Sequence, residues 1–216
     1  MQEARERGWN LSETKSMWGK NMAHVTRAIL APAEAMLGEP EHRTWTYPIS
    51  PAEMHMVVSS TRGQTRLHDV TLFIFNQRGQ VALIRKHSYP PGAWRAPGGG
   101  IHPGESFAEG AAREALEETG LTVRLTRYLL RVDVTFTCGD TVQPWTTHVV
   151  TAATDQEHLQ TGDPHEIEGV SWGTLEELCG PVAEVMLGTG RGLFTYRVAL
   201  HREVAGLLGV NPGSST

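Results

Sequence analysis

Residues 99–121, GGIHPGESFAEGAAREALEETGL, read as a glycine loop that leads into an acidic helix. Ser106 followed three residues later by Glu109 is a capping-box pattern, which predicts that a helix begins there. Gly120 is typical of the position just past the end of a helix. The stretch therefore predicts a loop followed by one helix that ends near residue 119.

The predicted helix has one small face and one acidic face. At about 100° per residue, five side chains share a face that lets the helix lie close to a sheet: Ala108, Ala111, Ala112, Ala115 and Thr119. Glu114, Glu117 and Glu118 lie on an adjoining face, where exposed like charges repel by roughly 0.2–0.5 kcal/mol per pair. Removing one charge, as in Glu118→Gln, is then expected to leave stability unchanged or slightly higher. The plainer alternative is a solvated acidic face.

The spacing of the fixed residues resembles the signature of the Nudix hydrolase family. Gly99, five residues, Glu105, seven residues and then REALEETGL from Arg113 fit G-x5-E-x7-R-E-U-x-E-E-x-G-U, in which U is aliphatic. Ala115 departs from the pattern because it is smaller than the usual first U. The resemblance covers about residues 67–208 and implies an α/β/α sandwich with a mixed β-sheet.

The resemblance also implies a metal site. In proteins with this signature, Glu114, Glu117 and Glu118 hold divalent ions, and a carbonyl of the Gly98–Gly99 turn contributes a ligand. Clustered oxygen ligands suit Mg²⁺ or Mn²⁺, which also bind substrate phosphates. Such ions polarise phosphoryl oxygens and lower the pKa of a bound water. Hydrolysis of a diphosphate bond is the chemistry that follows.

Two residues of the signature are expected to support the carboxylates. Arg113 and Glu105 would form a salt bridge that orients the glutamates, a role next to the metal ligands that such sites usually need. An incidental surface pair is the alternative. Glu105, Arg113, Glu114, Glu117 and Glu118 are thus the candidate catalytic residues of the signature.

A general base in this family often comes from a late loop. The candidates are Asp155, Glu157, Glu166 and Glu168. Glu166 is chosen because Asp-Pro-His-Glu-Ile precedes Trp172 by a few residues, which resembles the family's loop glutamate before a strand. The alternative is a solvated Glu166, with Glu114 as the base.

Cations and aromatic residues flank the glycine loop and are candidate substrate contacts. Arg85, Lys86 and Arg95 are placed to meet phosphates. Tyr89 and Trp94 are placed to stack on a base. Arg85, Trp94 and Arg95 are the residues chosen. Ordinary strand and loop positions are the alternative for each of them.

Composition limits the kinds of partner. The net charge of -5 makes long nucleic acid a poor partner, although a local basic pocket can hold a nucleotide. A hydrophobic content of 39% allows a real core. No apolar run is long enough to span a membrane and no signal peptide is apparent, so a cytoplasmic protein is expected. Cys138 and Cys179 have no metal-binding spacing.

Residues 1–42 are expected to form a helical N-terminal extension, and residues 43–216 the Nudix domain. Trp18, Met22, Val25 and Ile29 recur at helical spacing. Their stripe is interpreted either as core packing or as the surface of a homodimer. Proline at position 32 is expected to end or kink this helix.

The remaining elements follow from local pattern. Expected strands lie at 44–47, 70–75, 81–85, 123–136, 145–151 and 170–172, with a hairpin turn at 76–80. Helices are expected at 51–58, at 174–178 from the Thr174 and Glu177 capping box, and at 193–207. This order of strands and helices favours a mixed sheet covered on both faces.

The sequence predicts a Mg²⁺-dependent Nudix pyrophosphohydrolase acting on a nucleoside diphosphate linked to another moiety. Nucleotide sugars, ADP-ribose, dinucleoside polyphosphates and oxidised nucleoside triphosphates all stay open as substrates. One alternative is a Nudix-like domain that senses a nucleotide without hydrolysing it. An isopentenyl diphosphate isomerase is another, but the cysteine that it needs cannot be placed at Cys138 or Cys179.

Overall fold

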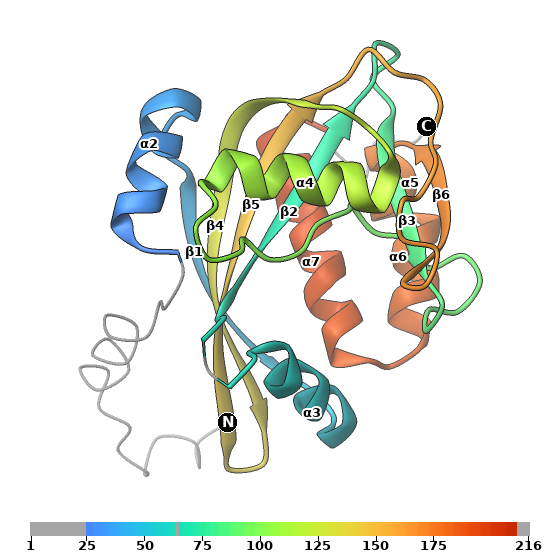
Figure 1. Cartoon of the computed structure of the whole chain (residues 1–216). Helices are drawn as coiled ribbons and strands as arrows, with labels where there is room; N and C mark the ends of the chain where they lie inside the picture. Colours follow the sequence, from blue (N-terminus) through green and yellow to red (C-terminus); the bar gives the residue numbers. More distant parts are fainter. Residues whose placement is uncertain (1–24, 64, 211–216) are drawn as a thin grey trace.

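The computed structural model describes residues 25–63 and 65–210. Six strands form one mixed sheet in the order β1-β4-β5-β2-β3-β6 (Figure 1). β1 runs parallel to β4 and β5 parallel to β2, while the other neighbours are antiparallel. The strands are β1 (Glu41–Pro48), β2 (His68–Phe75), β3 (Val81–Lys86), β4 (Arg124–Cys138), β5 (Thr141–Ala153) and β6 (Ile167–Gly173).

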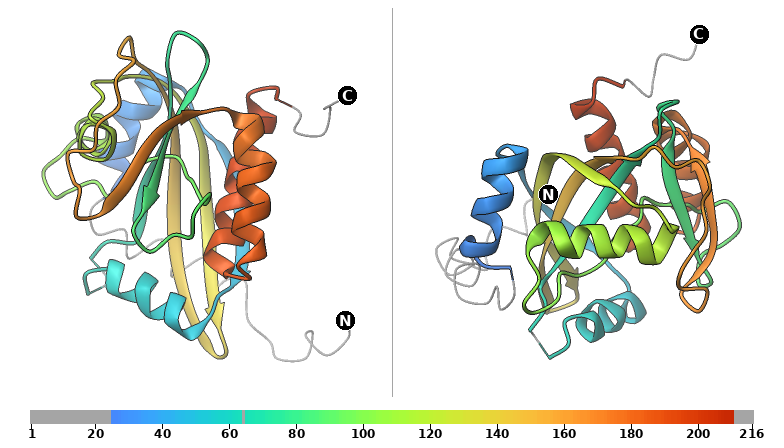
Figure 2. Two further views of the ribbon diagram at one scale, coloured as in Figure 1. Left: turned by 90° about the vertical axis from the view of Figure 1, so that its right-hand side faces the viewer. Right: turned by 45° about the horizontal axis from the view of Figure 1, so that its top comes forward.

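Helices cover both faces of this sheet (Figure 2). They are α2 (Arg27–Leu37), α3 (Pro51–Ser60), α4 (Phe107–Thr119), α5 (Leu175–Cys179), α6 (Pro181–Gly188) and α7 (Gly192–Leu207). One apolar cluster joins the sheet to α2 and α4, and a second joins it to α3, α5, α6 and α7. The expected α/β/α sandwich is thereby confirmed. None of the described helices is long and apolar enough to cross a membrane.

Strand β2 shows why two layers of helices form. The strand is buried almost throughout, and its second half, Leu72 to Phe75, is a continuous apolar run, as in strands that are buried on both faces. Leu72 and Ile74 belong to the cluster with α4, whereas Phe73 belongs to the cluster with α7. Because side chains alternate along a strand, one apolar run supplies both cores.

The N-terminal segment packs on the same molecule where it is described. Val25 is fully buried and Ile29 packs against the α2–α4 cluster, so these two residues serve as core. α2 continues through Pro32, so the expectation that this proline ends the helix is wrong. Trp18 and Met22 lie outside the described residues, and a homodimer stays a prediction. The expected domain boundary between residues 42 and 43 falls within β1.

Candidate active site

The glycine loop enters the sheet between β2 and β3. On one side, the amides of Val70 and Leu72 donate to the carbonyls of Gly99 (2.8 Å) and Pro97 (2.9 Å). On the other side, Arg95 forms an isolated antiparallel bridge with β3. A Cβ on Gly98, whose φ is +144°, would lie 2.0 Å from the carbonyl oxygen of Val70. The loop therefore needs glycine there and is held as firmly as a strand.

Helix α4 begins and ends where the sequence predicts. Ser106 accepts from the amide of Glu109, and the Glu109 side chain accepts from the amide of Ser106, which forms the complete capping box. Gly120 follows the helix with a left-handed φ of 74°. The small residue Gly110 lets the glycine loop lie against the helix, since a Cβ there would be 2.6 Å from Ile101.

Arg113 is the centre of the carboxylate network. Its Nε and Nη2 donate to the two oxygens of Glu105 at 2.6 and 3.1 Å, and its Nη1 donates to Glu114 (3.0 Å) and Glu117 (2.9 Å). Nη2 also donates to the carbonyl of Gly100 at 2.7 Å. These hydrogen bonds from Arg113 lower the pKa of Glu105 to about 2. The expected Arg113–Glu105 pair thus fastens the loop to the helix.

Glu118 and Arg95 form a buried ion pair beneath the pocket. Arg95 Nη2 lies 3.1 Å from Glu118 Oε1, and both side chains are less than 8% exposed, at 5% and 7%. The other oxygen of Glu118 accepts from the amide of Gly98. Burial disfavours the charged form of Arg95, but Glu118 together with Tyr89, Asp69 and Glu166 outweighs this effect and raises the pKa of Arg95. Glu118 is therefore neutralised, not repelled, and the expectation that Glu118→Gln is harmless to stability needs correction.

Glu114 is buried beside the glycine loop. A Cβ on Gly99 would lie 2.3 Å from Glu114 Oε2, so the carboxylate rests directly on the loop backbone. Burial raises the pKa of Glu114, while the hydrogen bond from Arg113 opposes that effect. Glu114 is thus a carboxylate of the pocket wall whose charge is only partly compensated.

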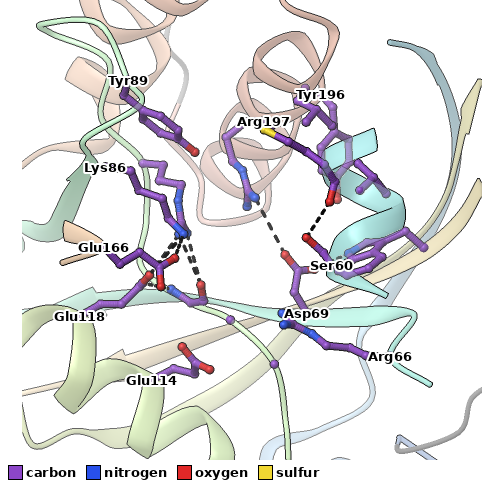
Figure 3. A pocket seen from close by; sticks show the side chains of 18 of the residues that line it. Ser60, Arg66, Asp69, Lys86, Tyr89, Glu114, Glu118, Glu166, Tyr196 and Arg197 are labelled. Carbon is purple, nitrogen blue, oxygen red and sulfur yellow. Dashed lines mark hydrogen bonds and ion pairs between the residues drawn. The ribbon is translucent and has the colours of Figure 1, made fainter. Parts of the chain in front are cut away.

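Lys86 connects the late loop to the α4 carboxylates. Its Nζ forms an ion pair with Glu166 and lies 4.0 Å from Glu118 Oε1. His87 Nε2 lies 3.0 Å from the carbonyl oxygen of Pro164, so a second contact holds the same loop. Figure 3 shows Lys86 reaching toward Glu166 and Glu118, which lie together at one side of the pocket. Glu166 therefore faces the signature carboxylates, as its predicted role requires.

The other late-loop acids have partners elsewhere. Asp155 accepts from Gln77 at 3.1 Å. Glu157 lies 3.7 Å from Arg78. Glu168 pairs with Arg85. None of these three acids lines the pocket that contains Glu166 and the α4 carboxylates.

The structure places two of the three chosen substrate contacts outside this pocket. Arg85 pairs with Glu168 at 2.8 Å and its guanidinium lies 5.7 Å from the centre of the Trp94 ring. Because side chains alternate along β3, Lys86 faces the pocket and Arg85 faces away. Arg95 does line the pocket, but its guanidinium is held by Glu118. The geometry favours Lys86 over Arg85 as a substrate contact.

A pocket of about 490 Å³ unites the signature carboxylates with residues from distant segments. Its volume lies within the range of small-molecule sites. The lining residues that the sequence did not single out include Arg62, Arg66, Asp69, Trp145, Arg191, Tyr196 and Arg197. They belong to the segment after α3, to β2 and β5, and to α7 with the residue before it, so only tertiary folding brings them together.

The carboxylates of α4 offer the oxygen donors that a hard divalent ion prefers. Glu114, Glu117 and Glu118 all line the pocket next to Gly98 and Gly99. Among the described residues, no three acidic, histidine or cysteine side chains converge in a metal-binding arrangement, because Arg113 and Arg95 hold the glutamates. The Gly99 carbonyl already accepts from Val70. The donor set fits a divalent ion, provided that Glu114 and Glu117 turn away from Arg113 and that Glu118 turns an oxygen away from Arg95 or Gly98.

The family model of the NUDIX domain matches residues 65–192. The chain belongs to the NUDIX domain family. Among similar curated proteins, the RNA pyrophosphohydrolase of Escherichia fergusonii is 30% identical over 119 residues, which cover 48% of this chain and 66% of that protein. The protein of the same name from Salmonella arizonae is 29% identical over the same shares. The chain thus spans about two thirds of the length of these relatives.

One of the solved structures that match this chain is an Ap4A hydrolase from C. elegans in a binary complex. It is 21% identical, and the match covers 65% of this chain and 98% of that chain with a TM-score of 0.44. The family match and the relatives' names support the prediction of a Nudix pyrophosphohydrolase.

Proposed function

We propose that this chain is a divalent-metal-dependent pyrophosphohydrolase that cleaves the diphosphate bond of a nucleoside diphosphate derivative. The observation that supports it most is the meeting of two separate acidic segments in one pocket. Glu114, Glu117 and Glu118 come from α4, and Glu166 comes from the loop before β6. Cations beside them, such as Lys86, suit a substrate that carries phosphates.

Glu114, Glu117 and Glu118 would hold Mg²⁺ or Mn²⁺, with the Gly98 carbonyl as a further donor. The ion would neutralise phosphate charge and lower the pKa of a water. Arg113 keeps the first two glutamates in place through Nη1, at 3.0 and 2.9 Å. This guanidinium is itself anchored on Glu105, so its position does not depend on substrate.

Glu166 is the proposed general base. Its carboxylate reaches the pocket and is 53% exposed, which leaves it open to a water molecule. It would take a proton from the attacking water at a carboxylate oxygen. Lys86 now pairs with that carboxylate, so phosphate binding would draw the ammonium away and free the base.

The alternatives fit the geometry less well. A nucleotide-sensing domain has no need of the four acidic residues that meet in this pocket, Glu114, Glu117, Glu118 and Glu166. An isomerase would use a cysteine, but Cys138 and Cys179 do not line the pocket and Cys179 is buried.

The test is a panel of nucleoside diphosphate derivatives assayed for release of phosphate-containing products. The panel holds nucleotide sugars, ADP-ribose, dinucleoside polyphosphates, oxidised nucleoside triphosphates and a triphosphate-ended RNA, the last because of the relatives' name. We expect turnover of at least one compound with Mg²⁺ or Mn²⁺ and none in EDTA. Undiminished turnover in EDTA would refute the metal-dependent mechanism. Binding without any turnover would favour the sensing domain.

A further inference from the structure

Besides Arg95 and Arg113, which hold the carboxylates, four arginines line the pocket. We call them the arginine wall: Arg62, Arg66, Arg191 and Arg197. Figure 3 shows Arg66 and Arg197 across the pocket from Lys86. The other acidic residues in the described lining lie on α4 or in the loop before β6. Asp69 is therefore the one acidic residue beside these arginines in that lining. Within the described lining, this side of the pocket therefore carries an excess of positive charge.

Arg66 is held in place without an acidic partner. Its Nε donates to the carbonyl of His68 at 3.2 Å, and its guanidinium lies 5.8 Å from the centre of the Trp145 ring. A Cβ on Gly100 would lie 2.4 Å from Arg66 Nε, so the guanidinium rests against the glycine loop. Across the described residues, Arg66 forms no ion pair, and Nη1 and Nη2 donate no hydrogen bond. The two terminal nitrogens are thus available to a ligand.

Arg62 adds a second uncompensated charge. It is exposed, lines the pocket and adopts a positive φ of 47°, the one such value for a non-glycine residue in the described chain. Such a conformation costs of order 1–3 kcal/mol and tends to occur where a side chain is held for function. No ion pair of Arg62 is found within residues 25–63 and 65–210.

The other two arginines of the wall have weak acidic partners. Arg197 Nη2 lies 3.9 Å from Asp69 Oδ2, while its Nη1 donates to Thr71 at 3.1 Å. Asp69 Oδ1 is already taken by the side chains of Trp145 (2.9 Å) and Thr147. Arg191 lies 3.8 Å from Glu53. One aspartate that serves several donors cannot neutralise the wall.

A diphosphate held at the α4 carboxylates has Lys86 beside it, so Arg62 and Arg66 add positive charge beyond what that diphosphate alone calls for. A guanidinium group donates paired hydrogen bonds to the charged oxygens of a phosphate. A neutral sugar has no such pair of charged acceptors. We infer that the preferred substrate carries a further phosphate group, beyond the scissile diphosphate, and that Arg66 and Arg62 bind it. This inference rests on the proposed function, since it assigns the scissile bond to the α4 side.

Binding of product-like probes tests this inference without any hydrolysis. Affinities of AMP, adenosine 3′,5′-bisphosphate and adenosine 2′,5′-bisphosphate are measured by calorimetry with Mg²⁺ at constant salt. We expect at least one bisphosphate to bind about tenfold more tightly than AMP, the scale of one added charge-assisted contact. Equal affinities of all three probes for the wild-type protein would overturn the inference.

Two variants then identify the residues that cause the tighter binding of the bisphosphate. Arg66→Gln and Arg62→Gln should each lower the bisphosphate-to-AMP preference several-fold, with AMP affinity little changed. Arg78→Gln is the matched control, because Arg78 is 72% exposed and lies outside the pocket. Arg62 is on the surface, so its variant tests the site even if Arg66→Gln fails to fold. A preference that persists in both folded pocket variants would overturn the assignment.

The binding preference can be judged separately from the proposed hydrolysis. Where the enzyme turns over dinucleotides, kcat/KM for NADPH should exceed that for NADH, which differs by one phosphate, and Arg66→Gln or Arg62→Gln should remove the difference. A protein that prefers the bisphosphates yet hydrolyses nothing would support the phosphate site and refute the hydrolase. A hydrolase without any preference would do the reverse.

Discussion

The two sides of the pocket are built from the chain in different ways. The acidic side comes from one helix and the loop before it, so its residues keep a fixed spacing in sequence. The arginine wall comes from the segment after α3, from Arg191 and from α7. The side-chain carboxylate of Glu53 on α3 joins these parts, because it accepts from the amides of Gly192 (3.3 Å) and Leu193 (3.0 Å) at the start of α7. A helix imposes the geometry of its own side chains, whereas the wall depends on how separate elements dock.

The acidic side also neutralises its charges internally, and this gives the largest expected effect. Glu118→Gln should destabilise the protein by about 3–5 kcal/mol, because it leaves Arg95 as a buried charge without its partner. Turnover should also be lost. Melting curves and activity with and without Mg²⁺ measure both effects.

Glu117→Gln separates stability from chemistry on the same helix. Glu117 is 51% exposed and pairs with Arg113, so its loss should change stability by only about 0.2–0.5 kcal/mol. Turnover should fall by more than about 100-fold, beyond the usual effect of disturbing an outer partner of a metal ligand. The exposed Glu184 of α6 is the matched control, as Glu184→Gln. Full activity in Glu117→Gln would exclude it as a metal ligand.

The next effect concerns the base that faces the acidic side. Glu166→Gln should lower kcat by about 10²–10⁴ with little change in KM, the usual range for loss of a general base. Asp155→Asn and Glu157→Gln should change kcat far less, because both acids have partners outside the pocket. If Glu166→Gln keeps its activity, the role passes to Glu114. A loss confined to KM would instead make Glu166 a binding residue.

The last effect leaves the chemistry untouched, appears only as the pH falls and concerns α7, which carries Arg197 of the arginine wall. His201 is fully buried, and neither ring nitrogen has a hydrogen-bond partner among the described residues. Burial lowers its pKa from 6.5 to about 3. The unfolded chain therefore binds this proton at a higher pH than the folded protein does. Its contribution to stability is complete above pH 6.5 and falls by at most about 1.4 kcal/mol per pH unit toward pH 3.

His201→Leu should remove that part of the pH dependence. Chemical unfolding at several pH values between 7 and 4 measures the slope for both proteins. An unchanged slope in the variant would show that other groups cause the acid sensitivity. Glu105 titrates in a lower range, between 4.5 and about 2, so the two contributions can be told apart.

The sequence predicts the features that depend on local geometry, as on the acidic side of the pocket. Ser106, Glu109 and Gly120 mark the ends of α4 because caps act within a few residues, and the Arg113–Glu105 pair follows from one turn of helix and its loop. Most strands were predicted because buried strands are apolar runs.

What the sequence missed depends on contacts between distant segments. Helix α6 was not predicted, since its eight residues are mostly apolar and show no clear period. Arg95 reads as a phosphate contact, but folding places it under Glu118. Arg66 gives no local signal, because its place in the pocket depends on Gly100 and Trp145. The correct face of Lys86 was available from strand alternation.

The insertion of the glycine loop between β2 and β3 limits local opening of the site. The amide hydrogens of Val70 and Leu72 exchange with solvent only when their hydrogen bonds to the carbonyls of Gly99 and Pro97 break. That event breaks the middle of the sheet, so it belongs to global unfolding and not to local opening. The floor of the pocket therefore stays rigid for as long as the protein remains folded.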